Sequence, residues 1–324
     1  MSVKSELLKL LEQNDESFVS GAMLAEKLSV SRNAVWKAVE ALRAEGYDIA
    51  AATNKGYRLE GSGDVLSAVG ISNNIKTLGI FEIEVRKKVT STNTLLREMA
   101  AQGVPEGYVL AAEEQTAGKG RQGRAFHSPA RHGVYFSLLL RPGFKTSDAS
   151  LITSAAAVAA ARAIETVIGV RVGIKWVNDL FVGSLKVCGI LTEAVFGMES
   201  GLVESAVLGI GINITRPEGG FPDELRDVAV SLMDRSVGLD NERCRLIAAV
   251  LDNFWGFYQN LGRREFLDEY RERSVILGRD INVVSFDGIR PAKAVAIDGD
   301  CGLQVQYENG EIAVLSSGDV SIRF

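Results

Sequence analysis

The sequence predicts an α+β protein with several domains, and three observations lead to this fold class. The chain has 324 residues, more than one hydrophobic core usually serves. Its first 60 residues read as short helices followed by a hairpin, whereas from Ile281 onward the apolar residues recur with period two. Between these ends strands and helices are mixed, which predicts a sheet covered by helices. We therefore expect three domains, at residues 1–62, 63–273 and 274–324.

Composition indicates a cytoplasmic protein without a structural metal. Apolar residues make up 46% of the chain and charged residues 24%, as in ordinary soluble proteins. The longest apolar stretch, residues 154–163, is too short to cross a bilayer, and the N-terminus lacks the apolar segment of a signal peptide. Three scattered cysteines and two histidines give neither a disulfide framework nor a metal-ligand pattern. The net charge of −5 argues against nonspecific coating of nucleic acid but permits one local contact surface.

The N-terminal elements follow the order of a winged helix-turn-helix. The third helix is the best defined, because Ser31 is a good N-cap and Gly46 a good residue to follow its end. In this motif the first residues of the third helix reach base edges in the major groove. The elements are expected at residues 3–13, 21–28, 31–46, 47–51 and 57–59. The DNA contacts are expected at Ser31, Arg32, Asn33, Trp36, Lys37 and Lys55.

The alternative for this module is binding to another protein, and its total charge does not decide between the two. Residues 1–60 hold eight Lys and Arg against nine Asp and Glu. However, Arg32 and Lys37 are the only charged residues from Val30 to Val39, and the wing adds further cations. A basic edge on a nearly neutral module favours a repressor that binds DNA as a dimer.

The central and C-terminal patterns predict the remaining elements. Helices are expected at residues 95–102, 148–167, 246–261 and 264–273, and residues 65–78 form a helix or an irregular cover. Central strands are expected at residues 81–89, 108–112, 135–140, 171–176, 185–193 and 206–214. Five short strands with Asp-Gly and Asn-Gly turns then predict a small β-barrel of SH3-like size, at residues 281–286, 292–297, 303–307, 311–315 and 320–322.

A loop at residues 115–129 combines glycines with cations. Gly118, Gly120 and Gly123 spell G-x-G-x-x-G, yet a strand rather than a helix follows, so no helix N-terminus is available for a pyrophosphate. No Gly-Lys-Ser/Thr closes the loop, which excludes a Walker motif. The cations on the loop or beside it are Lys119, Arg121, Arg124 and Arg131. The loop is therefore either an anion site, which the glycine spacing favours, or a solvated basic loop.

Three further features predict a ligand pocket. The polar run Thr90–Thr94 exceeds what an N-cap needs and suits a ureido or amide group, although capping alone remains an alternative. Lys186 starts an apolar strand and either enters the sheet from its rim or lies on the surface. Gly209 and Gly211 share one face of a strand with Asn213, which predicts a floor for a flat ligand.

Four stretches together resemble the biotin protein ligases, and the whole length resembles their bifunctional bacterial form, which also represses biotin synthesis genes. The glycine and arginine loop is close to diagnostic when a Lys-Trp-x-Asn-Asp strand follows at this distance. The stretches are Ser91-Thr92-Asn93, Gln115 to Arg124, Lys175-Trp-Val-Asn-Asp with Lys186-Val-Cys-Gly-Ile-Leu, and Gly209-Ile-Gly-Ile-Asn213. The resemblance implies a class II synthetase-like α/β catalytic domain with a mixed sheet, between a winged helix and an SH3-like barrel.

The resemblance also implies a two-step reaction, in which biotin and ATP give biotinyl-5′-AMP and an acceptor lysine of biotin carboxyl carrier protein then takes the biotin. Lys186 and Arg121 would be catalytic, and Asp179 is a candidate contact for Mg²⁺. Biotin contacts would be Ser91, Thr92, Asn93, Gln115, Gly118, Lys119, Gly120, Arg121, Lys186, Gly189, Gly209 and Gly211. Contacts to ATP or the adenylate would be Arg121, Arg124, Phe126, Lys186 and Asn213. Other implied partners are operator DNA and a second copy of the chain, in a dimer promoted by ligand, with no membrane.

The sequence departs from the usual family pattern at four positions. Lys119 and Gln122 stand where arginines are usual, Phe126 replaces a tryptophan, and Val177 replaces a proline. Lys119 keeps the charge but loses the bidentate geometry of a guanidinium group. Two alternative functions remain: a regulator that only senses a small anion, and a lipoyl or octanoyl transferase. Retention of Lys186 and Arg121 disfavours the first, and the winged helix with the glycine loop disfavours the second.

Overall fold

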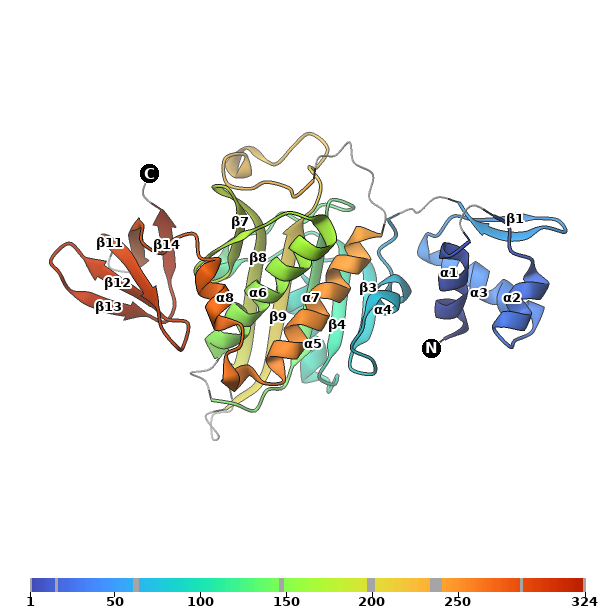
Figure 1. Ribbon diagram of the computed structural model, residues 1–324, viewed down its shortest axis with the longest axis horizontal. Coiled ribbons are helices and arrows are strands. Elements are labelled where there is room, and N and C mark those ends of the chain that lie inside the picture. The colour runs from blue at the N-terminus through green and yellow to red at the C-terminus, as the bar shows by residue number, and fades with distance from the viewer. Residues whose placement is uncertain are drawn as a thin grey trace.

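The computed structural model describes residues 2–14, 17–60, 64–145, 149–196, 202–233, 241–285 and 288–322. Three units follow one another along the long axis of the molecule (Figure 1). A small helical unit lies at the N-terminal end, a large sheet with helices occupies the centre, and a small sheet lies at the C-terminal end. This arrangement confirms the predicted α+β class and the order of the parts.

The N-terminal unit is the predicted winged helix. It consists of α1 (Val3–Glu12), α2 (Gly21–Lys27), α3 (Arg32–Glu45) and the hairpin β1 (Ile49–Ala52) and β2 (Gly56–Leu59). Ser31 Oγ accepts a hydrogen bond from Ala34 N at 3.2 Å, and Gly46 ends α3 with a φ of 109°. The first wing strand begins two residues later than predicted, because Tyr47 N still donates to Leu42 O and the Tyr47 ring is buried.

The central unit holds a seven-stranded sheet in the order β3-β4-β5-β9-β8-β7-β6. Only the β3–β4 pair is parallel, so the sheet is mixed as expected. The prediction of one strand at residues 171–176 was incomplete, since a second short strand, β7, pairs with both neighbours. The strands are β3 (Glu82–Val89), β4 (Tyr108–Gln115), β5 (Gly133–Leu140), β6 (Gly173–Lys175), β7 (Asp179–Val182), β8 (Leu185–Phe196) and β9 (Val203–Asn213).

Helices cover both faces of this sheet. On one face α6 (Ala149–Ile168) and α7 (Glu242–Tyr258) pack together, with α4 (Ala68–Asn74) and α8 (Leu267–Glu272) beside them (Figure 1). On the other face lies α5 (Thr92–Ala101), whose Leu96 packs on Leu110, Leu139 and Val207. Short 3-10 helices occur at residues 121–123, 223–225 and 261–263.

Helix α6 supplies the centre of the core. Its alanines from 155 to 161 are fully buried, as their small size predicts for close packing of a helix on a sheet. The whole of α6 is long and apolar enough to cross a membrane. This corrects the expectation, drawn from residues 154–163 alone, that the longest apolar stretch is too short to do so. In the fold, however, 72% of that apolar window is buried inside the protein. Its apolar character is therefore accounted for by the core.

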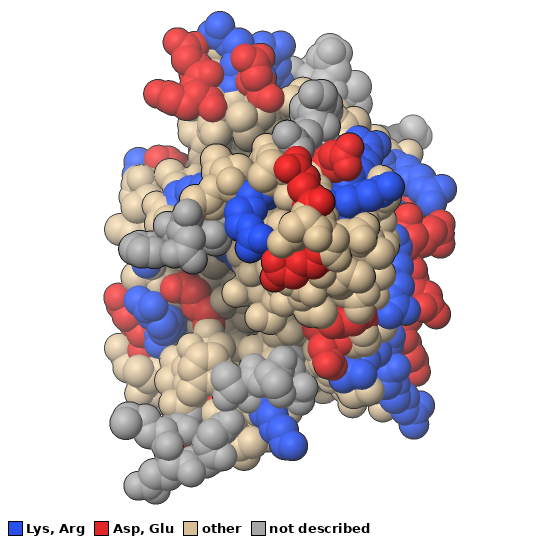
Figure 2. Space-filling view, turned by 90° about the vertical axis from the view of Figure 1, so that its left-hand side faces the viewer, with Lys and Arg blue, Asp and Glu red and all other residues tan. Residues whose placement is uncertain are grey.

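The C-terminal unit is the predicted small β domain. Its strands β10 to β14 pair antiparallel in the order β13-β12-β11-β10-β14. Trp176 Nε1 joins it to the central unit by donating to Cys301 O at 2.8 Å. Figure 2 looks onto this end of the molecule, where acidic and basic side chains are interspersed on a largely uncharged surface. The strands are β10 (Asp280–Ser285), β11 (Gly288–Ile297), β12 (Leu303–Tyr307), β13 (Ile312–Leu315) and β14 (Asp319–Ile322).

Candidate active site

The residues predicted to hold biotin meet around one cavity. It lies on the face of the sheet that α5 covers, between the N-terminus of α5, strands β8 and β9, and the glycine loop. Gly118 does not line it: a Cβ there would lie 2.4 Å from Phe126 O, so this glycine lets the two sides of the loop approach each other. The predicted residues in the lining are Ser91, Thr92, Asn93, Gln115, Lys119, Gly120, Arg121, Lys186, Gly189, Gly209 and Gly211.

Glycines form the floor of the cavity, as predicted from their alternation. Gly189 and Gly211 lie directly opposite each other in the β8–β9 pair, and Gly209 follows on the same face. A Cβ at Gly209 would lie 2.0 Å from Asn93 Oδ1, and one at Gly211 would lie 2.5 Å from the Phe126 ring. Side chains cannot approach so closely, so both positions require glycine while Asn93 and Phe126 keep their places.

Hydrogen bonds fix the wall formed by the start of α5. Thr92 N donates to Gln115 Oε1 at 2.8 Å, and Gln115 Nε2 donates to Ser128 Oγ at 2.9 Å. Ser91 is the N-cap of α5 and is 2% exposed. Ser91 therefore performs the capping role that the sequence left as an alternative. Gln115 joins Thr92 to Ser128 at the far end of the loop.

Asn93 and Ser137 form a buried layer below this wall. Asn93 Nδ2 donates to Glu193 Oε2 at 2.9 Å, and Ser137 Oγ lies 2.6 Å from Asn93 Oδ1. Ser137 also lies 2.8 Å from Thr92 Oγ1 and is fully buried. Sequence reasoning missed Ser137, because a single serine in an apolar strand carries no local signal. Asn93 is engaged at both ends of its amide, so it orients the pocket wall.

The glycine loop forms a tight hairpin over the cavity. Phe126 N donates to Gly118 O at 2.8 Å and Gly120 N donates to Arg124 O at 2.7 Å. Gln122 lies at the hairpin tip with a φ of 53°, a left-handed conformation. Burial lowers the pKa of His127, so the positive charge of the loop at neutral pH comes from its lysine and arginines.

A chain of polar contacts connects the loop with Lys186. Arg121 Nη1 donates to Asn178 Oδ1 at 3.0 Å, and Asn178 Nδ2 donates to Asp179 Oδ1 at 3.0 Å. Lys186 Nζ completes the chain at 2.7 Å from Asp179 Oδ1. Asn178 was quoted within the Lys-Trp-Val-Asn-Asp stretch but was not predicted as a site residue. Lys186 therefore points into the site, and its surface alternative is wrong.

Phe126 fills most of the site in this structure. A Cβ at Gly189 would lie 3.1 Å from both the Phe126 ring and Lys186 Nζ, so ring and lysine converge on the same glycine. The remaining cavity has a volume of only about 40 Å³. Ligand pockets usually enclose roughly 300–1,000 Å³. A ligand of ordinary size therefore requires Phe126 and the glycine loop to move outward.

Two of the predicted nucleotide contacts lie outside the lining. Asn213 is at the end of β9, where its Nδ2 lies 3.4 Å from Val230 O, and Arg124 is exposed on the loop. Lys186 pairs with residues 228–230 through backbone hydrogen bonds of 2.8 and 2.9 Å. This segment therefore borders the site beyond Lys186, a position that the sequence did not predict. Arg131 lies elsewhere, at the junction with the winged helix.

Asp179 is a poor metal ligand as it stands. Its carboxylate pairs with Lys186, and no group of three or more His, Cys, Asp or Glu suited to a metal occurs among the described residues. Mg²⁺ commonly binds one or two carboxylates together with substrate phosphates. Asp179 fits that manner of binding, with the phosphates supplying the other oxygens.

The predicted DNA contacts are all exposed on the winged helix. Ser31, Arg32 and Asn33 are exposed at the start of α3. Trp36 follows one turn later and is 51% exposed, which is unusual for so large an apolar side chain. Lys37 and Lys55 are exposed as well. The face is thus free to contact a major groove.

Comparison with known families gives three matches along the chain. Residues 3–58 match a helix-turn-helix domain. Residues 85–213 match the Biotin/lipoate A/B protein ligase family, and residues 276–323 match the Biotin protein ligase C terminal domain. The matches fall on the three structural units described above.

Similar proteins agree over the full length. The chain is 34% identical to the bifunctional ligase/repressor BirA of Bacillus subtilis, over 99% of both chains. It is 29% identical to the protein of the same name from Escherichia coli, over 98% of both. Among solved structures, the biotin protein ligase of Aquifex aeolicus in complex with biotin and ATP matches 75% of this chain and 98% of its own, with a TM-score of 0.61 and 27% identity.

Proposed function

Because the chain belongs to the biotin protein ligase family, we propose that it attaches biotin to an acceptor lysine using ATP and represses transcription in response to biotin. It is an ATP-dependent biotin ligase that also carries a DNA-binding repressor domain. The observation that supports the ligase most directly is the convergence of Arg121, Lys186 and the glycine floor on one cavity.

We propose that the charged groups of this cavity carry the first step. A carboxylate oxygen of biotin attacks the α-phosphorus of ATP, and pyrophosphate leaves as the new phosphorus–oxygen bond forms. Both reactants are anions, so cations held in place near the reacting oxygens lower the barrier. Lys186 and Arg121 are held in this way through Asp179 and Asn178.

In the second step the amine of the acceptor lysine attacks the acyl carbon, AMP leaves, and the amine loses a proton. The acceptor is proposed to be a biotin carboxyl carrier protein. The adenylate must survive until this partner arrives, and a closed loop protects it from water. We propose that the loop closes over the adenylate after Phe126 has left the glycine floor.

We expect the purified protein to label one acceptor lysine when biotin, ATP, Mg²⁺ and an acceptor domain are supplied. Mass spectrometry of the acceptor measures the product, and omission of ATP is the control. If no lysine is labelled, the alternative function remains, in which the protein is a regulator that only senses a small anion. Labelling with lipoate or octanoate in place of biotin would support the transferase alternative.

Replacement of Arg121 with alanine is expected to release the adenylate into solution. The guanidinium group is the link between the loop and Asn178, so its loss removes the contact that holds the loop closed. A filter-retention assay with labelled ATP measures the fraction of adenylate that stays bound. Arg171, an exposed arginine that pairs with Glu272 and lies outside the lining, provides the control as Arg171→Ala. Equal retention in both variants would remove Arg121 from the mechanism.

Operator binding is expected to tighten when biotin and ATP are present together. Arg32→Ala should weaken it by about 10- to 100-fold, as loss of one base contact does. Arg43, at the far end of the same helix and bonded to Ile49 O, is the control cation as Arg43→Ala. A gel shift with palindromic operator DNA measures both effects. Operator binding of equal strength with and without biotin and ATP would contradict the proposal that the protein represses in response to biotin.

The remaining parts of the proposal concern assembly and location. We propose that ligand promotes a homodimer, because a dimer presents two recognition helices to a palindromic operator. We propose Mg²⁺ as cofactor, entering with the ATP phosphates and contacting Asp179. We place the domain limits at residues 1–62, 63–273 and 274–324, and we propose a cytoplasmic location.

A further inference from the structure

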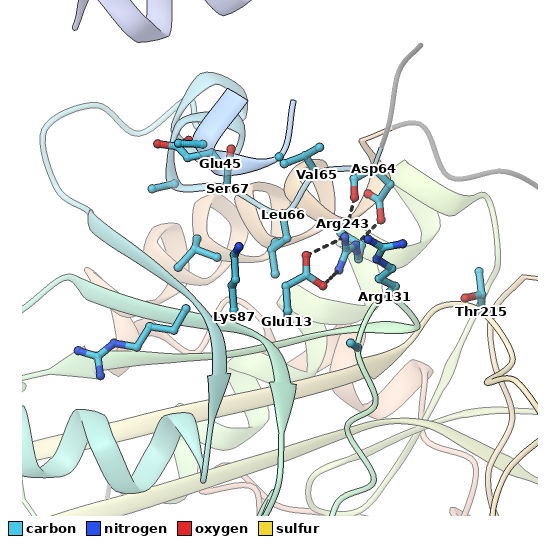
Figure 3. Close-up of a pocket in the computed structure, with 16 residues that line it drawn as sticks. Glu45, Asp64, Val65, Leu66, Ser67, Lys87, Glu113, Arg131, Thr215 and Arg243 are labelled. Atoms are coloured by element: carbon cyan, nitrogen blue, oxygen red, sulfur yellow. Dashed lines mark hydrogen bonds and ion pairs between the residues drawn. The ribbon is translucent and has the colours of Figure 1, made fainter. Parts of the chain in front are cut away.

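The winged helix and the catalytic unit meet at a second cavity of about 970 Å³, which is larger than the cavity at the biotin site (Figure 3). The end of α3 forms one wall, and the segment that enters α4 forms another. The remaining walls include Glu113, just before the glycine loop, and Arg131, just after it. Both ends of the loop that covers the biotin site therefore run into the junction with the DNA-binding domain.

Arg243 is a buried cation at this junction, with only 1% of its side chain exposed. Its Nε is bonded to the Asp64 carboxylate and its Nη2 donates to Asp64 O at 2.6 Å. Its Nη1 donates to Glu113 Oε2 at 2.6 Å, and Nη2 lies 3.1 Å from Glu113 Oε1 (Figure 3). A buried guanidinium group with bidentate partners on both sides holds them in a fixed geometry. We call these three residues the Arg243 clasp.

One end of the clasp is attached to the winged helix. Asp64 lies shortly before α4, and Val65 and Val69 pack into the core of the winged helix. Tyr47, just after α3, contacts α4 through a hydrogen bond of 2.7 Å between its hydroxyl and Ser67 Oγ. The winged helix is therefore packed against α4, and the chain is already fixed in place at Asp64. Residues 61–63 lie outside the described part of the chain.

The other end of the clasp is attached to the biotin site. Glu113 lies on β4, two residues before Gln115, whose side chain holds Thr92 in the pocket wall. The pocket wall is thus connected to the winged helix through the end of β4, the Arg243 clasp and α4. None of the clasp residues lines the biotin cavity.

We propose that Arg243, with Asp64 and Glu113, positions the winged helix relative to the biotin site, so that loop closure over the adenylate is transmitted to operator binding. This inference rests on the proposed repressor function. Arg243 is a positioning residue in this account, because it touches neither substrate nor DNA. A purely structural role would instead affect ligation and operator binding equally, and that difference can be measured.

The test uses Asp64→Asn, because Arg243→Ala would leave two partly buried carboxylates without their shared cation and would endanger folding. The amide keeps a polar group at the position and removes the charge. The matched control is Glu165→Gln, which changes one of two carboxylates on the largely buried Arg273, away from the winged helix. Biotin transfer by both variants is expected to stay within about twofold of wild type, since neither residue lines the cavity.

Operator binding in the presence of biotin and ATP is expected to weaken about tenfold or more in Asp64→Asn but not in Glu165→Gln, the size of a typical allosteric coupling. A second measurement tests the position of the winged helix relative to the catalytic unit in the absence of DNA and substrate. Spin labels on Met23→Cys and Leu78→Cys, both at exposed positions, report the distance between the winged helix and the catalytic unit. The three native cysteines are buried and should react poorly with the label. The distance distribution is expected to broaden in Asp64→Asn only.

Two outcomes would overturn the clasp proposal. One is wild-type operator affinity and biotin response in Asp64→Asn, with an unchanged distance distribution. The other is a parallel loss of ligation and operator binding, which would indicate a structural role alone. Failure of the wild-type protein itself to bind operator would instead overturn the proposed repressor function, so the two failures are distinguishable.

Discussion

Replacement of Lys186 with alanine is expected to slow formation of biotinyl-5′-AMP by about 100- to 1,000-fold, the usual effect of removing one group that stabilises charge in a transition state. Lys186 Nζ lies over Gly189 and is held 2.7 Å from Asp179, so its charge is in place before substrates bind. The rate of pyrophosphate release from biotin and ATP measures this step directly.

The control for this prediction is Lys175→Ala. Lys175 belongs to the same Lys-Trp-Val-Asn-Asp stretch, but its ammonium group lies 5.5 Å from the centre of the Phe181 ring and outside the cavity lining. Comparison of the two variants shows whether the reaction needs the cation within the cavity or any cation close to it. A normal rate of pyrophosphate release in Lys186→Ala would contradict the role assigned to this lysine.

Replacement of Gly209 with alanine is expected to weaken biotin binding by about 100-fold, the loss that a displacement of about 1 Å at a binding group can cause. The added methyl group would lie 2.0 Å from Asn93 Oδ1 and would push Asn93 away from Ser137 and Glu193. Thr92 contacts the same Ser137 hydroxyl, so the whole pocket wall would shift. Calorimetric titration with biotin measures the effect.

Gly256→Ala is the matched control, since no side chain or backbone outside its own stretch of α7 lies within 4 Å of the position of its Cβ. Alanine is favoured over glycine in a helix by roughly 0.5–1 kcal/mol, so this variant should be slightly more stable and bind biotin normally. Thermal unfolding of both variants separates global stability from binding. Normal biotin affinity in Gly209→Ala would show that Asn93 moves without consequence and would refute this account of the floor.

Phe126, which stands where the family usually has a tryptophan, is compatible with the proposed ligase reaction. Its ring packs on Gly211 and lies edge-on to Tyr135, with ring centres 6.3 Å apart. In this structure the ring covers the glycine floor that a flat ligand needs. A phenyl ring can cover the apolar part of a bound ligand after it has moved, although it lacks the hydrogen-bond donor of the tryptophan that is usual in the family.

The sequence by itself determined the features whose signals are local. Capping residues and helical periodicity specified α3 of the winged helix, and period two with Asp-Gly and Asn-Gly turns specified the C-terminal strands. The alternation of Gly209 and Gly211 gave the floor, since side chains two residues apart in a strand share a face. The resemblance to the biotin protein ligases then assigned the pocket residues, and most of them line one cavity.

Only the tertiary structure decided which distant residues meet. Ser137 and Asn93 are 44 residues apart, and Arg243 and Asp64 are 179 apart, so neither contact leaves a local pattern. The fold likewise directed Arg131 to the junction and brought Asn178 between Arg121 and Lys186. The physical reason is that caps, turns and periodicity depend on a few neighbouring residues. The partner of a buried polar group, in contrast, is set by how sheet, helices and loops pack together.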